Sequence, residues 1–181
     1  MRADARRNRE RIVATALDLF AERGPGVSME DIACAAGLGV GTLYRHFPDR
    51  GALVADLATT TLSGLRDHVR AGLAEDVSRW EVLLRVVRYC AGQPLALITS
   101  LGAGATPSTA APVELIQEVD ALLARLAAQA QEEGTLRGDI TPEQVVGLLN
   151  VMVCRPGARF DDPLSTVMLD GLKAPGPASR G

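Results

Sequence analysis

The sequence has few aromatic residues and only three cysteines, and both scarcities limit how the chain can fold. Aromatic residues make up 3% of the 181 residues, whereas apolar residues make up 47%. A core must therefore come mainly from leucine, valine and alanine, which favours helices packed on helices. Cys34, Cys90 and Cys154 are widely separated and lack both Cys-x-x-Cys spacing and neighbouring histidines. Neither a disulfide framework nor a zinc site is expected, and the cysteines are predicted to be small buried residues.

Long hydrophobic runs are also missing. No apolar stretch approaches the roughly 20 residues that a membrane-spanning helix needs. The N-terminal residues "MRADARRNRER" are not followed by the apolar segment of a secretory signal. We therefore expect a cytoplasmic protein with no membrane partner.

The chain lacks the side-chain sets on which most enzymes depend. Its two histidines, His46 and His68, are predicted on separate helices. The pattern contains no nucleophile with a base, no carboxylate pair and no set of metal ligands. We therefore expect no catalytic residue, no metal and no cofactor. An enzyme or ligand carrier built on a helical bundle is the competing class, and a DNA shift assay at low salt would separate it from a DNA-binding protein.

The charges are unevenly distributed along the chain. The formal net charge is −3, but residues 1–11 hold five arginines and two acidic residues, whereas residues 51–181 hold eleven basic and fifteen acidic residues. A basic N-terminal segment suits a phosphate backbone. The alternative interpretation is a solvated run of charge.

Three helices are predicted within the first 48 residues. The first lies in "RERIVATALDLFAERG" (residues 9–24), where apolar residues recur at helical spacing and Gly24 followed by Pro25 ends the pattern. Ser28 with Asp31 forms an N-cap for the second helix, which ends at Gly37. Leu43 and Phe47 form the apolar stripe of a third helix, barely two turns long.

The glycines of "AAGLGVGTLYRHFPDR" (residues 35–50) raise the question of a phosphate-binding loop. A dinucleotide fingerprint needs Gly-x-Gly-x-x-Gly directly after a strand, but Thr42 stands where the third glycine should be and a capped helix comes before. Gly37 instead supplies the left-handed conformation that ends a helix. The segment therefore predicts a helix-turn-helix, which presents its second helix to the major groove of DNA.

Residues 10–57, "ERIVATALDLFAERGPGVSMEDIACAAGLGVGTLYRHFPDRGALVADL", resemble the N-terminal domain of the TetR (tetracycline-repressor) family of transcriptional regulators, most specifically in "GTLYRHFPDRGAL". The resemblance implies an all-α homodimer with a three-helix DNA-binding head and a helical-bundle body. It also implies a repressor that binds a pseudo-palindromic double-stranded DNA operator and leaves it when a small-molecule effector binds the body. The alternative is a helix-turn-helix used only for protein contacts, which would leave Arg50 and the basic N-terminus unexplained.

The resemblance also assigns roles to residues of the head. Thr42, Tyr44 and His46 match DNA-facing positions of the recognition helix, Arg45 matches a variable base-reading position, and Arg50 and Ser28 match phosphate contacts. Their chemistry suits these roles, because hydroxyls bond phosphates and arginine can bond guanine with two donors. The predicted DNA-binding residues are Ser28, Val40, Gly41, Thr42, Tyr44, Arg45, His46 and Arg50.

Several of these residues have a plainer interpretation. Tyr44 can belong to the core of the head with only its hydroxyl in water. His46 can be a residue at a helix end, Ser28 a cap alone and Arg50 a solvated side chain.

The rest of the chain predicts a helical body. We expect residues 1–50 to form the DNA-binding domain, residues 51–174 a ligand-binding and dimerisation domain, and residues 175–181 a disordered tail. Residues 102–112 change abruptly to Gly, Pro, Ser, Thr and Ala and predict a mobile loop. The predicted ligand pocket is lined by Trp80, Leu84, Val87, Tyr89 and Cys90. Arg85 and Arg88 are one turn apart and could receive a carboxylate, although exposed arginines are the commoner case.

The last two helices are predicted to form the dimer interface. Apolar residues wrap most of the helix that begins after the Thr141-x-x-Gln144 capping box, so this helix must be covered on more than one side. A final helix begins at Pro163 after an Asp162 cap. Pairing these two helices with those of a second subunit would give a four-helix interface. Its predicted residues are Val145, Leu148, Leu149, Met152, Leu164, Met168 and Leu172.

Overall fold

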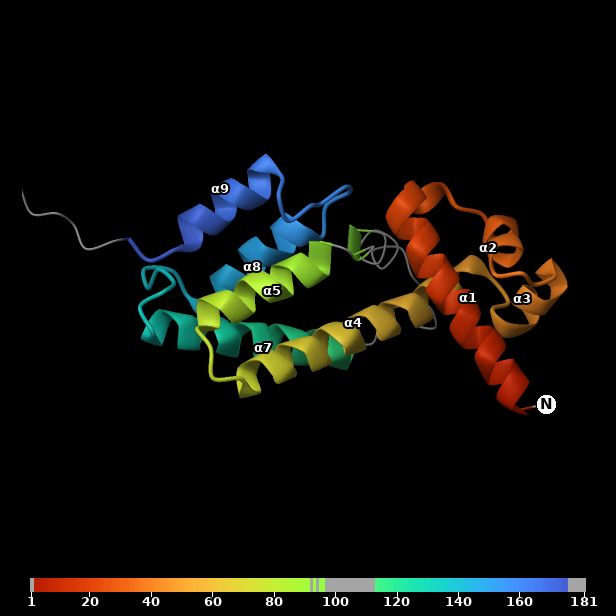
Figure 1. Cartoon of the computed structure of the whole chain (residues 1–181), viewed down its shortest axis with the longest axis horizontal. Coiled ribbons are helices and arrows are strands. Elements are labelled where there is room, and N and C mark those ends of the chain that lie inside the picture. Colours follow the sequence, from red (N-terminus) through yellow and green to blue (C-terminus); the bar gives the residue numbers. More distant parts are fainter. Residues whose placement is uncertain (1, 92, 94, 97–112, 176–181) are drawn as a thin grey trace, which may run out of the picture. The chain divides into compact units, whose positions relative to one another are not determined.

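A computed structural model of the chain describes residues 2–91, 93, 95–96 and 113–175, most of which lie in α-helices (Figure 1). Apart from one isolated bridge between Leu136 and Lys173, the residues within these ranges form no β-structure. The prediction of an all-α fold is confirmed. The predicted loop at 102–112 and residues 176–181 of the predicted tail lie outside the described residues. The chain divides into two compact units, Met1–Thr61 with Gln93–Val113, and Leu62–Gly92 with Glu114–Gly181.

The first unit contains the head. Helix α1 spans Arg2–Arg23, a 3-10 turn spans Gly24–Gly26, and the short helices α2 and α3 span Met29–Ala35 and Val40–His46. The long helix α4 (Arg50–Ala74) begins in this unit, and α1, α2 and α3 gather around its first turns in Figure 1. One buried cluster joins all four helices and includes Ile12, Ala16, Phe20, Ile32, Leu43, Phe47, Leu53 and Leu57. Because Leu53 and Leu57 belong to α4, the core of the head extends past the domain boundary predicted after residue 50.

The helix-turn-helix is held by local hydrogen bonds that the sequence predicts. The Ser28 hydroxyl accepts a bond from the Asp31 N–H (3.0 Å), and the Asp31 carboxylate accepts one from the Ser28 N–H (3.1 Å), so α2 begins with a capping box. The hydrogen bond from the Ser28 hydroxyl lowers the pKa of Asp31. At the other end Gly37 has a φ of +63°, and the Leu38 N–H bonds the Ala33 carbonyl (2.9 Å). This is the glycine-terminated helix end that the sequence predicts.

The second unit contains the rest of α4 and four further helices. They are α5 (Arg79–Ala91), α7 (Val113–Glu132), α8 (Pro142–Val153) and α9 (Pro163–Leu172). Both predicted caps are present, since Thr141 and Gln144 form a capping box and the Asp162 carboxylate accepts the Ser165 N–H (2.9 Å). Helix α8 packs on both α5 and α9. Their shared interior contains Val82, Leu83, Val86, Val87, Leu126, Val145, Leu149, Met152 and Leu172.

Helices α4 and α5 approach each other closely at two glycines. A side-chain carbon at Gly72 would lie 2.5 Å from Val82 Cγ1, and one at Gly64 would lie 2.5 Å from the Tyr89 hydroxyl oxygen. The Tyr89 ring also stacks on His68 of α4, with 4.9 Å between ring centroids. The packing of the two helices therefore requires glycine at Gly72, whereas a side chain at Gly64 would displace only the end of the Tyr89 side chain.

The cysteines are not all buried, so one prediction is wrong. Cys90 is buried, and desolvation raises its pKa to about 12, which keeps the thiol protonated at neutral pH. Cys154 is half-buried. Cys34 is exposed, because α2 turns only Ile32 and Ala33 of this turn towards the head core.

Candidate nucleic-acid interface and helical body

Helix α3 has one side buried in the head and another side that exposes both polar and apolar side chains. Leu43 and the following Phe47 are buried, whereas Val40 and Tyr44 are each 42% exposed. Tyr44 is therefore not part of the head core, contrary to the alternative interpretation.

Of the other predicted DNA contacts on this helix, Gly41 and Arg45 are exposed, and Thr42 and His46 are half-buried. The helix begins at Val40, and its N-cap, Gly39, provides no side-chain hydrogen bond to the first turn.

Two of the predicted DNA contacts are bonded to each other. The Arg45 guanidinium donates to the Thr42 hydroxyl over 2.9 Å, one turn earlier on α3. This bond holds the arginine along the helix surface in the absence of a partner. Ser28 is half-buried and its hydroxyl also donates to the Asp31 carboxylate (2.7 Å). Capping accounts for Ser28, and a phosphate contact by the same hydroxyl stays a prediction.

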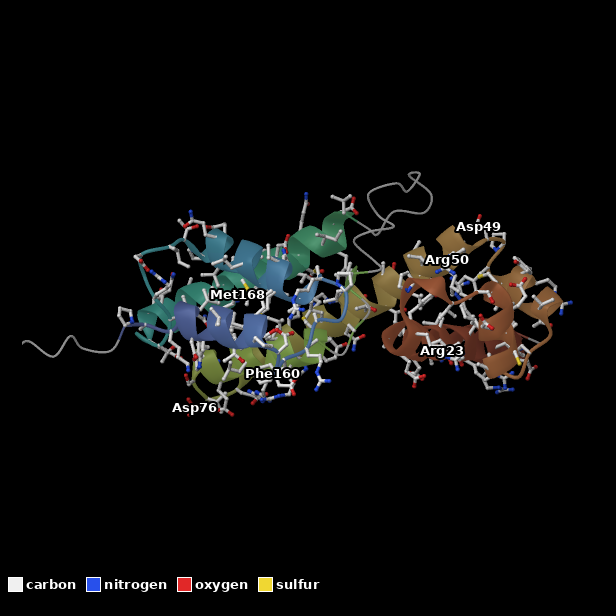
Figure 2. The ribbon with its side chains drawn as sticks, turned by 90° about the horizontal axis from the view of Figure 1, so that it is seen from above. Arg23, Asp49, Arg50, Asp76, Phe160 and Met168 are labelled. Atoms are coloured by element: carbon white, nitrogen blue, oxygen red, sulfur yellow. The ribbon has the colours of Figure 1, made fainter. Side chains whose placement is uncertain are left out.

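Arg50 forms contacts within the head that the sequence does not predict. Its guanidinium donates to the carbonyl oxygens of Pro25 and Val27 and lies over the Phe20 ring, 5.0 Å from the centroid. Figure 2 shows Arg50 beside the ribbon of the head. Arg50 thus joins the start of α4 to the loop between α1 and α2. The solvated interpretation of Arg50 is wrong, and a phosphate contact stays a prediction.

The N-terminal arginines belong to α1 and are partly neutralised there. Arg6 pairs with Glu10 (2.9 Å) and Arg7 pairs with Asp4, both across one helical turn on an exposed surface. Arg9 instead contacts α3 and α4, a role that the sequence analysis missed. Nothing local to "RRNRER" distinguishes Arg9 from its neighbours, because its partners lie about forty residues further along the chain.

The residues predicted to line a ligand pocket differ in how deeply they are buried. Val87 and Cys90 face the interior of the body, and Trp80, Leu84 and Tyr89 are half-buried. Tyr89 is on the α4 side of α5, where it stacks on His68, and burial raises the pKa of its hydroxyl. A pocket formed by these residues stays a prediction.

The two arginines proposed to receive a carboxylate have partners within the chain. Arg85 binds both carboxylate oxygens of Glu75, at 2.9 and 3.3 Å. The Arg88 guanidinium lies over the Phe160 ring at 4.3 Å from its centroid, and Figure 2 labels this phenylalanine. Arg85 and Arg88 therefore have structural contacts that a ligand would have to displace.

The residues predicted for the dimer interface divide into two groups. Val145, Leu149, Met152 and Leu172 are buried within the chain's own body, so they cannot reach a second subunit in this conformation. Leu148 and Leu164 are exposed, and Met168, labelled in Figure 2, is half-buried. The sequence analysis missed the most exposed apolar residues of α8 and α9, which are Val151 (64%) and Val167 (69%).

Two protein-family models match this chain, one in its N-terminal part and one in its C-terminal part. A model described as bacterial regulatory proteins of the tetR family matches residues 12–57. A second model, described as the C-terminal domain of SbtR-like transcriptional regulators, matches residues 79–174, more than half of the chain. The protein belongs to the TetR family. It is a transcriptional regulator with a DNA-binding helix-turn-helix, in a family of ligand-responsive regulators that are not enzymes.

Individual TetR-family proteins resemble this chain over different lengths. HTH-type transcriptional regulators from several Staphylococcus aureus strains are 52% identical over 84 residues, which is 46% of this chain and 45% of theirs. The match thus spans less than half the length of these curated relatives. A solved TetR regulator from Mycobacterium vanbaalenii is 35% identical, with a TM-score of 0.65 over 95% of this chain and 98% of that one. The Thermus thermophilus repressor FadR, solved with lauroyl-CoA, is 25% identical, with a TM-score of 0.52 over 96% of this chain and 99% of its own.

Two further properties of this TetR-family chain concern membranes and metals. None of the helices in the described ranges is long and apolar enough to cross a bilayer. Within the same ranges, no three histidine, cysteine, aspartate or glutamate side chains are grouped so that they could hold a metal ion.

Proposed function

We propose that the protein is a repressor that binds a pseudo-palindromic operator as a homodimer and is released by a small molecule. The observation that carries the proposal is the exposed face of α3, where Tyr44 and Arg45 project from a helix anchored by the buried Leu43. A rigid helix with exposed hydrogen-bonding side chains is what reading base edges in the major groove requires. Two such helices in a symmetric dimer would reach half-sites about one helical turn, roughly 34 Å, apart.

The exposed apolar residues of α8 and α9 support the dimer. Leu148, Val151, Leu164 and Val167 lie on two helices that pack on each other. Single exposed apolar residues are ordinary, but a group on neighbouring elements indicates an interaction surface. A two-fold axis would place this surface against its own copy, as symmetric dimers do. The interface we propose is therefore centred on these four residues. The buried members of the predicted set belong to the core of the chain itself, and they are Val145, Leu149, Met152 and Leu172.

The effector is proposed to be a small and mostly apolar molecule. FadR, which is similar to this chain along nearly its whole length, was solved with lauroyl-CoA, and only the lauroyl chain of that ligand is apolar, so FadR supports an apolar chain as part of the effector. In this chain Trp80, Leu84 and Tyr89 are half-buried on α5. Partly exposed aromatic and aliphatic side chains are typical linings of sites for small molecules.

Arg45→Ala is expected to relax the sequence preference of the protein for its operator. A bidentate contact from arginine to guanine contributes about 1–3 kcal/mol of discrimination, so binding to the preferred sequence should fall by that amount while binding to unrelated DNA changes little. The measurement is a pair of titrations, one with a duplex selected from a random library and one with a scrambled duplex. Arg23→Ala, which removes an exposed arginine from the last turn of α1, is the matched control.

An equal loss of affinity for both duplexes would contradict the base-reading role of Arg45. Such a loss would show that Arg45 contributes charge alone, as a phosphate contact does. If the wild-type protein selects no sequence at all, the proposal of an operator-binding repressor is wrong.

A compound that raises the melting temperature of the free protein is expected to weaken operator binding. The rise in melting temperature reports only that the compound binds the folded protein. An effector that lowers operator affinity tenfold must itself bind the DNA-loaded protein tenfold less tightly, about 1.4 kcal/mol of coupling. Fatty acyl-CoA esters and apolar metabolites are screened by thermal shift, and operator affinity is then titrated with each hit. Hits that stabilise the protein and leave operator affinity unchanged would contradict release by ligand.

A further inference from the structure

We propose that Arg9 is a positioning residue for the recognition helix and not a phosphate contact. The inference rests on the proposed DNA-binding function, because it assigns to Arg9 the task of holding α3 in the orientation that reads an operator. All the contacts involved lie within the first compact unit.

Arg9 joins three helices through one guanidinium group. Its Nη2 donates to the Asp56 carboxylate on α4 over 2.6 Å, and its Nη1 donates to the carbonyl oxygen of His46, the last residue of α3, over 3.4 Å. The same group lies over the Phe47 ring, with 4.4 Å from Cζ to the centroid. Arg9 belongs to α1, so it joins α1 to the end of α3 and to the second turn of α4.

The physical chemistry of a helix end explains why a cation at this place orients α3. The last carbonyl groups of a helix have no partner within the helix and carry its partial negative charge. Helix α3 has only seven residues and few bonds of its own, so contacts at its end add to the packing of the buried Leu43 in fixing its orientation. The Arg9 guanidinium, which lies over Phe47 and donates to His46 and Asp56, restrains the end of α3 through three contacts.

The same contacts argue against a phosphate role. Both terminal nitrogens of Arg9 already have acceptors, and one of these is a carboxylate that would oppose an approaching phosphate. Asp56 is half-buried, whereas Arg9 is an exposed residue that is held by its partners and not by burial. Arg11 offers a contrast, because it is also exposed, one half-turn further along the same helix, but has no hydrogen bond or ion pair with the described residues.

The substitution Asp56→Asn distinguishes a phosphate-contact role of Arg9 from a positioning role, because the two roles predict opposite changes in DNA affinity. If Arg9 were a phosphate contact, removing the Asp56 charge would release the guanidinium and strengthen binding to every DNA sequence. If Arg9 positions α3, the same substitution weakens the restraint and lowers binding to the operator.

The experiment compares Arg9→Gln, Arg9→Lys and Asp56→Asn with Arg11→Gln in the full-length protein. We expect Arg9→Gln to lower affinity for a selected operator duplex by about tenfold, and Asp56→Asn to lower it by less, because the asparagine oxygen still accepts a hydrogen bond from Arg9. Affinity of Asp56→Asn for a scrambled duplex should not fall, so the ratio of the two affinities drops. Arg9→Lys should not restore the ratio, since an ammonium group keeps the charge but cannot stack on Phe47 while bonding both acceptors. Arg11→Gln should lower both affinities alike.

A measurement without DNA keeps this inference separate from the proposed function. Amide hydrogen exchange in residues 43–47 should be faster in Arg9→Gln than in Arg11→Gln, because the end of α3 loses its restraint. Stronger DNA binding by Asp56→Asn, full rescue by Arg9→Lys, or equal exchange in Arg9→Gln and Arg11→Gln would overturn the inference. If the wild-type protein binds no duplex, operator binding fails as a function, and the exchange result alone decides whether Arg9 holds α3.

Discussion

Val151→Glu is expected to convert the protein from a dimer into a monomer. Val151 is 64% exposed on α8, which packs on α9, so the substitution changes the proposed interface without entering the core of the chain. Two symmetry-related carboxylates would be buried without partners, and an unpaired buried charge costs several kcal/mol. Sedimentation velocity at micromolar concentration measures the change directly.

Loss of the dimer should also remove tight operator binding. A dimer holds its second head close to the second half-site, and joining two binding modules in this way can raise affinity by about 10²–10⁴-fold over one module alone. A monomer should therefore bind a palindromic duplex no better than a single half-site. Val167→Glu, on α9, is expected to have the same effect.

The control for these variants is Val113→Glu. Val113 is also an exposed valine (58%) at the start of α7, and it is not one of the four residues of the proposed interface. It should leave both mass and operator affinity unchanged. Leu149 is unsuitable for the test because it is buried in the chain itself, where a charge would destabilise the monomer. A wild-type protein that sediments as a monomer at micromolar concentration, or a Val151→Glu protein that remains a dimer, would refute the assigned interface.

Arg50→Ala is expected to destabilise the head and weaken binding to all DNA sequences. Hydrogen bonds from a charged group contribute about 1.5–3 kcal/mol, and Arg50 donates two of them to the carbonyls of Pro25 and Val27. These carbonyls belong to the loop just before the α2 cap, so their release would loosen the helix-turn-helix. Urea unfolding measures the stability, and titration with DNA at several salt concentrations measures the phosphate contribution.

Arg50→Lys separates the two roles of this residue. Lysine keeps the positive charge but lacks the planar fork that reaches two carbonyls while stacking on Phe20. If Arg50 acts only by contacting a phosphate, the lysine variant should keep wild-type stability and salt dependence. If the contacts within the head dominate, as we expect, the lysine variant should be nearly as unstable as Arg50→Ala while retaining the salt dependence. Wild-type stability of both variants would contradict a structural role.

Local patterns were sufficient where the structure depends on neighbours in the sequence. The Ser28 cap with Asp31, the left-handed Gly37 and the Thr141 cap with Gln144 were all predicted, because each involves bonds within a few residues. The head could be placed in the TetR family for the same reason, since its motif is contiguous. Apolar periodicity and caps predicted the three helices of the head and the last two helices of the body, although they did not show which apolar side of α8 faces inward.

The sequence by itself determined the class of the protein, its helices and its helix-turn-helix, because hydrophobic periodicity, caps and turns act over short distances along the chain. Only the tertiary structure decided which residues of those helices are available to a partner. Leu149 and Val151 are two positions apart on one apolar helix, yet one is buried and the other exposed. Arg6 and Arg9 are three positions apart in one basic run, yet one pairs along its own helix and the other bonds α3 and α4. Such differences depend on residues distant in sequence that folding brings within a few ångströms, and no local pattern records them.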